Sequence, residues 1–248
     1  MSNTPPTFRI GTAGWTLPKQ HAAAFPPEGS HLERYASAFN CVEINSSFYR
    51  SHMRKTWERW AGSTPHNFQF AVKMPKSITH AAKLVNCGAL LQTFFDEIHG
   101  LGERLGPVLV QLPPKLAFDS GIAHEFFTTL RELHSDLTAC EARHASWFAP
   151  EADRLLRDFK VARAAADPPK GSQLAATPGG WQGFHYYRLH GTPRTYYSDY
   201  SSASQSTLAT TLQKSSTAQT WVIFDNTALG HATANALSLA NLLSPSQQ

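Results

Sequence analysis

Short apolar runs recur along the 248-residue chain, and each is bounded by Gly, Pro or Asp. Eight are found: FRIGTAGW (8–15), CVEINSSF (41–48), FQFAVKMP (68–75), GPVLVQLP (106–113), LTACEARH (137–144), KVARAAAD (160–167), FHYYRLHG (184–191) and TWVIFDNT (220–227). Runs of this kind predict β-strands. Helical patterns separate several of them, at 30–39, 54–61, 86–100, 120–132, 146–157, 204–215 and 230–243. Strands that alternate with helices predict a parallel sheet, and eight such units predict a closed (β/α)₈ barrel of the TIM type.

The chain is expected to form one domain over residues 1–248, because it can bury one large core and no linker divides it. One unit is irregular. The segment PPKGSQLAATPGGWQG, between Asp167 and Phe184, is rich in Pro and Gly. The helix after the sixth strand is therefore expected to be short or replaced by a loop. The two ends, 1–6 and 244–248, are expected to be loose.

Composition restricts the compartment and the partners. Lys and Arg number 22 against 18 for Asp and Glu, a small excess that favours anionic partners without a basic run for nucleic acid. The three cysteines are far apart and form no CxxC pair, which indicates reduced thiols. No apolar run is long enough to span a membrane. We expect a cytoplasmic protein with no membrane contact, a small anionic ligand, and nucleic acid as an unfavoured partner.

Alternation along each strand separates residues that face the helices from residues that face the barrel interior. In CVEINSSF, Val42 and Ile44 share the helix-facing side, which leaves Glu43, Asn45 and Ser47 for the interior. The same reasoning gives further interior polar residues: Lys73, Gln111, Glu141, Arg143, Arg163, Arg188 and His190. In the eighth strand the choice between Asp225 and Asn226 stays open. Since an unpaired buried carboxylate costs several kcal/mol, we expect these charges to form one paired network.

Eight motifs follow one another along the chain: GTAGW (11–15), VEINSSFYR (42–50), FAVKMPKSITH (70–80), LGPVLVQLPP (105–114), EARHASWF (141–148), ARAAADPP (162–169), YYRLHG (186–191) and FDNTALGHA (224–232). Together they resemble the motifs of the YecE-like proteins, the domain-of-unknown-function family numbered 72. The resemblance covers nearly the whole chain and implies a (β/α)₈ barrel with a polar cavity, but no reaction. The family's usual FNNT reads FDNT here, so Asp225 adds a charge, and its GTSGW reads GTAGW, so Ala13 lacks a hydroxyl.

Polar groups at the C-terminal ends of barrel strands indicate an active site, because active sites of this fold lie on that face. We therefore expect an enzyme, of the hydrolase or isomerase kind, acting on a small phosphorylated, nucleotide or sugar-like anion. Proton transfer is assigned to Glu43, Glu141 and His190. Substrate binding is assigned to Trp15, Asn45, Tyr49, Lys73, Gln111, Arg143, Arg188, Arg194, Tyr196 and Asn226.

Several of these residues have a structural alternative. Asn226 is also suited to capping the last helix, and aromatic residues at a barrel mouth also pack loops. Lys73 is a charge anchor or, if desolvated, a nucleophile that forms a Schiff base. We prefer the anchor, because an ion pair with a carboxylate would keep the amine protonated. His80 is a further candidate acid or base, although a structural hydrogen bond explains it as well.

Three other functions stay open. A divalent metal such as Zn²⁺, Mn²⁺ or Mg²⁺ is one possibility, because carboxylates and imidazoles gather near strand ends: Glu43, Glu141, His144, Asp167, His190 and Asp225. The neighbouring lysine and arginines would repel it. The protein is alternatively a non-catalytic metabolite-binding protein. Metal-dependent cleavage of nucleic acid is the third alternative and is disfavoured by the small net charge.

Overall fold

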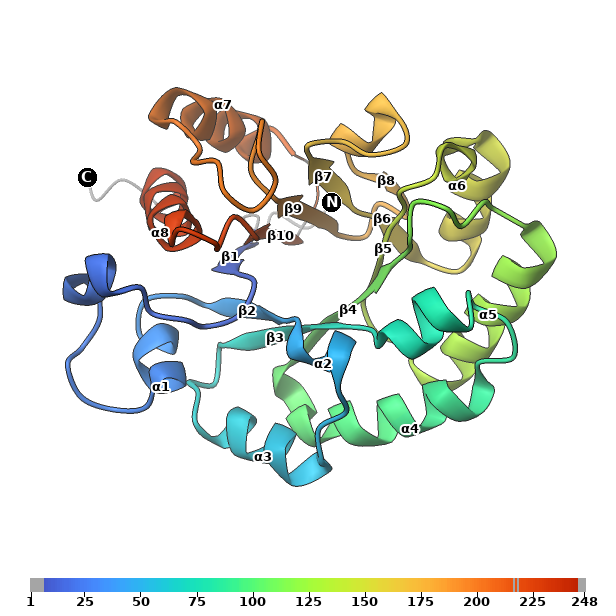
Figure 1. Cartoon of the computed structure of the whole chain (residues 1–248), viewed down its shortest axis with the longest axis horizontal. Helices are drawn as coiled ribbons and strands as arrows, with labels where there is room; N and C mark the ends of the chain where they lie inside the picture. Colours follow the sequence, from blue (N-terminus) through green and yellow to red (C-terminus); the bar gives the residue numbers. More distant parts are fainter. Residues whose placement is uncertain (1–6, 216, 218, 245–248) are drawn as a thin grey trace.

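In the computed structural model, strands in the middle of the molecule are surrounded by helices (Figure 1). The structure describes residues 7–215, 217 and 219–244. Its strands are β1 (Thr7–Thr12), β2 (Cys41–Ile44), β3 (Gln69–Lys73), β4 (Leu105–Gln111), β5 (Thr138–Glu141), β6 (Val161–Arg163), β7 (Ala165–Asp167), β8 (Gly179–Gly180), β9 (His185–Leu189) and β10 (Gln219–Phe224). The protein therefore has a mixed α/β fold, as the alternating pattern predicts.

The α-helices follow the predicted ranges closely. They are α1 (His31–Ala36), α2 (Ser46–Tyr49), α3 (Arg54–Gly62), α4 (Gly88–Ile98), α5 (Ser120–Leu133), α6 (Pro150–Asp158), α7 (Ser202–Gln213) and α8 (His231–Leu243). Short 3-10 helices cover Lys19–Ala24, His99–Arg104, Ala145–Phe148 and Gln173–Ala176, and a π-helical turn covers Ser77–Ala81. Side-chain caps fix several helix starts. Ser30 and Glu33 form a reciprocal capping box at α1, and Asp119 accepts a hydrogen bond from the Ile122 backbone at α5.

The strands form two sheets. One has the order β1-β10-β9-β7 and is parallel throughout. The other has the order β2-β3-β4-β5-β6-β8, in which only the short β8 is antiparallel to its neighbour. An isolated parallel bridge joins Ala13 to Glu43, and the single residue Ala164 separates β6 from β7. The sixth predicted strand, 160–167, is therefore divided between the two sheets.

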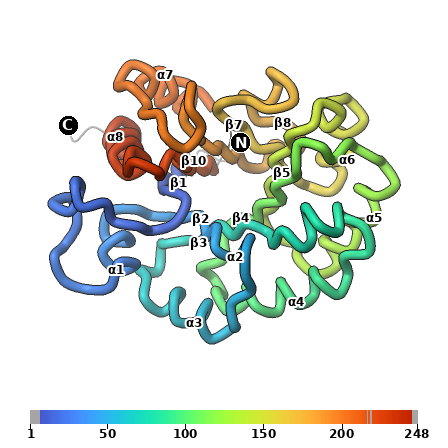
Figure 2. The backbone as a smooth tube through the Cα atoms, in the orientation of Figure 1, coloured from blue at the N-terminus to red at the C-terminus, as the bar shows by residue number. Residues whose placement is uncertain are grey.

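The chain runs once around the molecule from its first described strand to its last helix, as the colour sequence in Figure 2 shows. Strand β1 pairs with β10, the last strand in sequence, from Thr7 opposite Gln219 to Thr12 opposite Phe224. Parallel strands in both sheets bring their C-terminal ends to the same side. That side is where the interior polar residues of the prediction gather.

The segment after β7 contains no α-helix, as its Pro and Gly content predicts. Between Asp167 and Phe184 the chain forms only the 3-10 turn Gln173–Ala176 and the two-residue β8. Glycine is required at Gly180 of β8, because its φ of +61° is a conformation that other residues rarely adopt and a Cβ there would lie 2.7 Å from the Val161 carbonyl oxygen. A Cβ on Gly179 would lie 2.1 Å from the Arg163 guanidinium, which would have to move. The β6 edge is thus closed by a reversed chain rather than by a helix.

Two separate apolar layers flank the strands. The larger lies between strands and helices, and the smaller is formed by interior residues of nearly every strand: Cys41, Ala71, Leu109, Ala139, Ala162, Ala164, Phe184, Tyr186, Trp221 and Ile223. This confirms the predicted facing of β2 and β3, where Val42 and Val72 belong to the outer layer. It also decides the eighth strand, because Ile223 and Asp225 share the interior face. All three cysteines are free and buried.

A histidine is buried where α5 ends. His134 has 3% of its surface exposed, and its ring stacks on Phe95 of α4 with centroids 4.8 Å apart. Among the described residues, neither ring nitrogen has a hydrogen-bond partner. Burial lowers the pKa of His134 to about 4. The imidazole is therefore neutral near pH 7.

Two sequence predictions concern the limits of the fold. Residues 1–6 and 245–248, which are predicted to be loose, lie outside the described part, while the backbone of Ser244 still donates a hydrogen bond to Ala240. Across residues 7–215, 217 and 219–244, no helix combines the length and the apolar character needed to cross a bilayer. The predicted strand 41–48 is too long, because the chain turns helical at Ser46.

Candidate functional site

Arg188 is the centre of a charged cluster at the C-terminal side of the strands. It lies on β9 and is fully buried. Its Nε and one terminal nitrogen donate to the two oxygens of Glu43 on β2, at 2.9 and 2.6 Å. The other terminal nitrogen donates to Glu141 of β5 at 2.6 Å, and Asp225, just after β10, accepts a longer bond of 3.1 Å. One guanidinium therefore joins three carboxylates from both sheets, and Glu43, Glu141 and Arg188 meet as predicted.

Glu43 is satisfied entirely by buried partners. Besides its paired bonds with Arg188, its Oε2 accepts a hydrogen bond of 2.8 Å from the Tyr186 hydroxyl. Burial, reinforced by the Glu43 charge, raises the pKa of Tyr186 well above its ordinary value, so the phenol stays a donor. A carboxylate in a strand core is tolerated because each of its oxygens is bonded. The sequence pattern does not single out Tyr186, although Tyr186 and Arg188 are two residues apart and share one face of β9.

Glu141 accepts hydrogen bonds from three residues. Arg188 binds one oxygen, Arg143 binds the other at 2.7 Å, and the Gln111 amide donates to both at 3.2 and 3.1 Å. Burial alone would raise the pKa of Glu141, but the charges of Arg188, His190 and Arg143 hold it well below its usual range. The Arg143 side chain keeps 19% of its surface exposed, so this arginine is accessible to a ligand and Arg188 is not.

His190 lies between two carboxylates. Its Nδ1 is 2.9 Å from Asp225 Oδ2, and its Nε2 is 3.5 Å from Glu141 Oε1. Burial and the Arg188 charge oppose protonation, yet the Glu141 charge and the hydrogen bonds to Asp225 and Glu141 prevail and raise the pKa of His190. Burial also opposes ionisation of Asp225, but Arg188 and His190 lower its pKa. The arrangement favours a charged imidazolium that is able to donate a proton.

Lys73 departs from the predicted ion pair. Lys73 is the last residue of β3, and 8% of its surface is exposed. Within the described residues its amine forms no ion pair. The nitrogen lies 4.2 Å from the centre of the Phe48 ring. Burial and the charge of Arg188 lower the pKa of Lys73 to about 8. The predicted ion pair of Lys73 is not formed, because Arg188, with several donors in a fixed fork, binds the carboxylates instead. With a pKa of about 8 the amine is still mostly protonated near pH 7.

The predicted residues of the first two loops lie at a separate small pocket. Trp15 and Asn45 line a pocket of about 260 Å³ together with Ser46, and Trp15 packs edge-on against Trp60. The Asn45 Oδ1 atom is buried, with no hydrogen-bond partner among the described residues. Tyr49, in contrast, is 71% exposed. These residues lie near the strand ends, but within the described part of the chain the structure records no contact between them and the Arg188 cluster.

The loop after β9 places its predicted residues at the rim. Tyr196 turns its ring edge toward His190, with centroids 6.0 Å apart, and Arg194 stacks on Tyr197 at 3.9 Å. Asn226 faces away from the cluster, because its Nδ2 donates to the Ser198 carbonyl at 2.9 Å and to Asn235 at 2.8 Å. These bonds tie the loop to α8.

Arg163 is a correction to the predicted network. It pairs with Asp153 of α6 and lies over Phe148, on the helix side of the sheet. Two other candidates are held locally: His80 is hydrogen-bonded to its neighbour Thr79, and His144 Nδ1 lies 2.8 Å from the Ser146 hydroxyl. None of the three reaches the Arg188 cluster.

Among the described residues, no three His, Cys, Asp or Glu side chains are arranged to hold a metal ion. In the cluster itself, Arg188 lies between the carboxylates, at the position where a shared cation would be expected. The site is therefore organised around a guanidinium.

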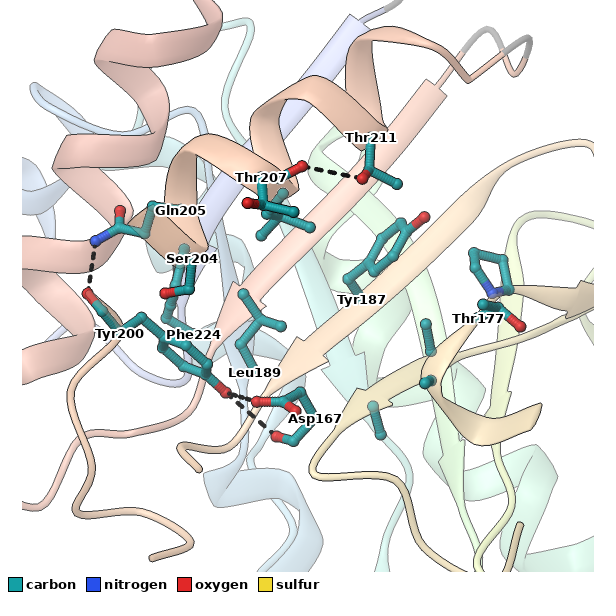
Figure 3. Close-up of a pocket in the computed structure, with 15 residues that line it drawn as sticks. Asp167, Thr177, Tyr187, Leu189, Tyr200, Ser204, Gln205, Thr207, Thr211 and Phe224 are labelled. Carbon is teal, nitrogen blue, oxygen red and sulfur yellow. Dashed lines mark hydrogen bonds between the residues drawn. The ribbon is translucent and has the colours of Figure 1, made fainter. Parts of the chain in front are cut away.

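An apolar cavity of about 360 Å³ lies on the outer side of the sheet (Figure 3). It is bounded by Tyr187 and Leu189 of β9, by Leu208 of α7 and by the loop 176–178. At one end, the Tyr200 hydroxyl donates to Asp167 at 2.6 Å. Because no α-helix follows β7, the loop 176–178 and α7 line the groove there. Asp167 thus belongs to this cavity rather than to the Arg188 cluster.

Fold and site together define an α/β protein with a buried, arginine-centred charge cluster at the C-terminal ends of its parallel strands. The chain belongs to the DUF72 family, described as a protein of unknown function, whose model matches residues 9–248. This confirms the family that the motifs indicate.

Curated and solved relatives agree with this assignment. The chain is 35% identical to the UPF0759 protein YecE of Escherichia coli K12 over 104 residues, 42% of this chain and 37% of that protein. It is 28% identical to the UPF0759 protein YunF of Bacillus subtilis over 152 residues, 57% of this chain and 52% of that protein. The chain thus matches about half or less of the length of these curated relatives.

Two solved structures share the fold. A DUF72 family protein from Thermotoga maritima superposes with a TM-score of 0.78 and 26% identity, over 96% of this chain and 99% of that chain. One from Enterococcus faecalis gives a TM-score of 0.80 and 19% identity, over 98% and 97%.

Proposed function

We propose that the protein is an enzyme that binds a small anionic substrate, phosphorylated, nucleotide or sugar-like, at the C-terminal ends of its strands. One observation carries the proposal. His190 lies between Glu141 and Asp225, Arg143 binds the same Glu141, and Lys73 is close enough for the charges of both carboxylates to act on its pKa. Arg143 and Lys73 are the cations of the cluster that keep some exposure. Acid-base chemistry on an anion requires two things: a group that donates a proton, and positive charge that the anion can reach.

Each residue has a proposed role. Arg143 and Lys73 bind the anion, and His190 with Glu141 transfers a proton. Arg188 and Glu43 are fully buried and bonded to each other, so we assign them the positioning of those groups rather than contact with substrate. Gln111 orients Glu141 through its amide. The rim residues Trp15, Asn45, Tyr49, Arg194, Tyr196 and Asn226 remain proposed contributors to substrate binding or to the loops around it.

We further infer that the two sheets belong to one closed eight-stranded barrel in a single domain. The bridge between Ala13 and Glu43 supports this at one junction, and the backbone bond from Ala164 to the Cys140 carbonyl, 2.9 Å, supports it at the other. The inner apolar layer also draws on strands of both sheets. A barrel of this kind places its active site on the face where the Arg188 cluster lies.

Calorimetric titration with inorganic phosphate tests the anion site. We expect binding that weakens as the pH rises above about 8, because Lys73 loses its proton there. The variant Arg143→Met should weaken phosphate binding by about 10- to 150-fold, since a hydrogen bond to a charged group contributes roughly 1.5–3 kcal/mol. Arg54→Met is the matched control, because Arg54 also pairs with a glutamate but is exposed on α3.

Equal phosphate affinity in wild type and Arg143→Met would reject the site. A second measurement separates an enzyme from a binding protein. A panel of sugar phosphates and nucleotides is incubated with the protein, and any captured compound is recovered and identified by mass spectrometry. A compound that is released chemically changed supports an enzyme. A compound that is captured and always released unchanged would instead establish the metabolite-binding alternative.

A further inference from the structure

We infer that the Lys73 amine forms an imine with its substrate, which makes that substrate a small anionic aldehyde or ketone. The inference rests on the proposed function, because it names the substrate class of the same site. Three features of Lys73 carry it: its position, the absence of a carboxylate partner within the described part of the chain, and its burial, which no other lysine shares.

Strand register fixes the position of the amine. Ala71 of β3 pairs with Glu43 of β2, and Lys73 follows two residues later. Residues two apart on a strand share a face. The side chain of Lys73 therefore leaves the interior face one layer nearer the strand ends than Glu43, which is bound to Arg188. A carbonyl compound entering from the strand ends would meet Lys73 before it met the buried Arg188 network.

The carboxylates of the cluster are all bonded to other groups. Glu43 is bound by Arg188 and Tyr186, Glu141 by both arginines and Gln111, and Asp225 by Arg188 and His190. The neighbour of the Lys73 nitrogen is instead the ring of Phe48. An amine without a carboxylate partner in a desolvated place loses its proton more easily, and a neutral amine is the nucleophile. The low pKa of Lys73, about 8, agrees with this.

Lys73 is the one lysine with these properties, because every other lysine of the chain is exposed. Lys76 is the most instructive comparison. It lies three residues later, and its nitrogen is 5.9 Å from the Tyr49 ring, yet its side chain is in solvent. At about pH 7 an amine of pKa 8 is neutral in roughly one molecule in ten, whereas an ordinary lysine is neutral in fewer than one in a thousand.

The covalent step balances without an oxidant or reductant. The lone pair of the neutral Lys73 amine attacks the carbonyl carbon, and one of the two protons of that nitrogen passes to the carbonyl oxygen to give a neutral carbinolamine. The nitrogen then loses its proton while the hydroxyl leaves as water, which gives the imine. The departing hydroxyl needs a proton, and the His190 imidazolium is the group of this site suited to supply it. Arg143 binds the anionic group of the same molecule.

Reductive trapping tests the inference. The intact protein is treated at about pH 7 with limiting glyoxylate, a small anionic aldehyde, and cyanoborohydride, which reduces an imine to a stable secondary amine. Peptide mapping by mass spectrometry then locates the carboxymethyl groups. We expect Lys73 to be modified on the order of tenfold faster than Lys76, because more of its amine is neutral although a less basic amine is also a weaker nucleophile. Modification of Lys73 no faster than that of Lys76 would overturn the inference.

Variants separate a nucleophile from a charge anchor. Lys73→Arg keeps a positive charge, so it should retain phosphate binding while the rapid glyoxylate modification disappears. Lys76→Met should leave the rapid modification intact. If phosphate binds and Lys73 is not trapped, the imine inference fails and the proposed anion site survives. If Lys73 is trapped and phosphate does not bind at any pH, the lysine is confirmed as the reactive amine while the phosphorylated substrate class is lost.

Discussion

His134 should make the folded protein sensitive to mild acid. The ring is buried against Phe95 without a hydrogen-bond partner among the described residues, and its pKa is lowered from 6.5 to about 4. In the unfolded chain His134 therefore binds a proton below about pH 6.5, whereas in the folded protein it binds one only below about pH 4. The favourable contribution is complete above pH 6.5 and is lost as the pH falls from 6.5 toward 4.

The size of this effect follows from the two pKa values. Each pH unit between them is worth about 1.4 kcal/mol, so the full loss is roughly 3 kcal/mol below pH 4. Between about pH 7.5 and pH 5 the same relation gives a loss of about 2 kcal/mol from this histidine alone. That is a large share of the roughly 5–15 kcal/mol by which single domains are stable.

Urea unfolding at these two pH values, followed by tryptophan fluorescence, measures the difference. His134→Phe keeps the stack on Phe95 and removes the titration, so its stability should fall by about 2 kcal/mol less than that of wild type. His124→Phe is the matched control, because His124 is an exposed histidine of α5 that also packs on a phenylalanine, Phe159. It should leave the pH dependence unchanged. If wild type and His134→Phe lose stability equally in acid, the account of His134 is wrong.

Three further substitutions test the cluster and the inner layer. Arg188→Met leaves three carboxylates buried without their shared cation, so it should lower the free energy of unfolding by about 3–5 kcal/mol. The urea midpoint measures this loss, and an unchanged midpoint would contradict the network. Asp225→Asn removes a hydrogen-bonding carboxylate that raises the pKa of His190, so the NMR titration midpoint of this imidazole should move down, and a midpoint that stays in place would disprove the coupling. Gly106→Ala brings a Cβ to 2.6 Å from the Trp221 ring, so we expect a loss of about 1–3 kcal/mol in urea unfolding, and a neutral effect would show that the ring moves freely.

The sequence predicts most of this architecture because the strands are strongly patterned. In β2 and β3 bulky residues occupy one parity only, and Val42 and Val72 indeed lie in the outer layer with Glu43 and Lys73 inside. The order of strands and helices follows from the same pattern. The Pro and Gly content after Asp167 likewise identifies the unit without an α-helix.

The errors have local physical causes. The strand around Arg163 is mostly alanine, so neither face is bulkier and the sequence does not show that its arginine points toward Asp153. The unpaired state of Lys73 depends on a competition for carboxylates that only the three-dimensional arrangement decides. For Asn226 the sequence allows either substrate binding or a structural role. Its hydrogen bonds to Ser198 and Asn235 show the structural role, and these partners are distant in sequence and are not part of a local motif.

The Arg188 network has a consequence for the order of folding. Arg188 belongs to one sheet, while Glu43 and Glu141 belong to the other, 145 and 47 residues away along the chain. Contacts of such long range form late, and burying either carboxylate before the guanidinium arrives is costly. During synthesis, β2 to β5 are therefore expected to stay loosely docked until β9 has emerged. The ion pairs that organise the site would then also delay compaction of the chain until both sheets are present.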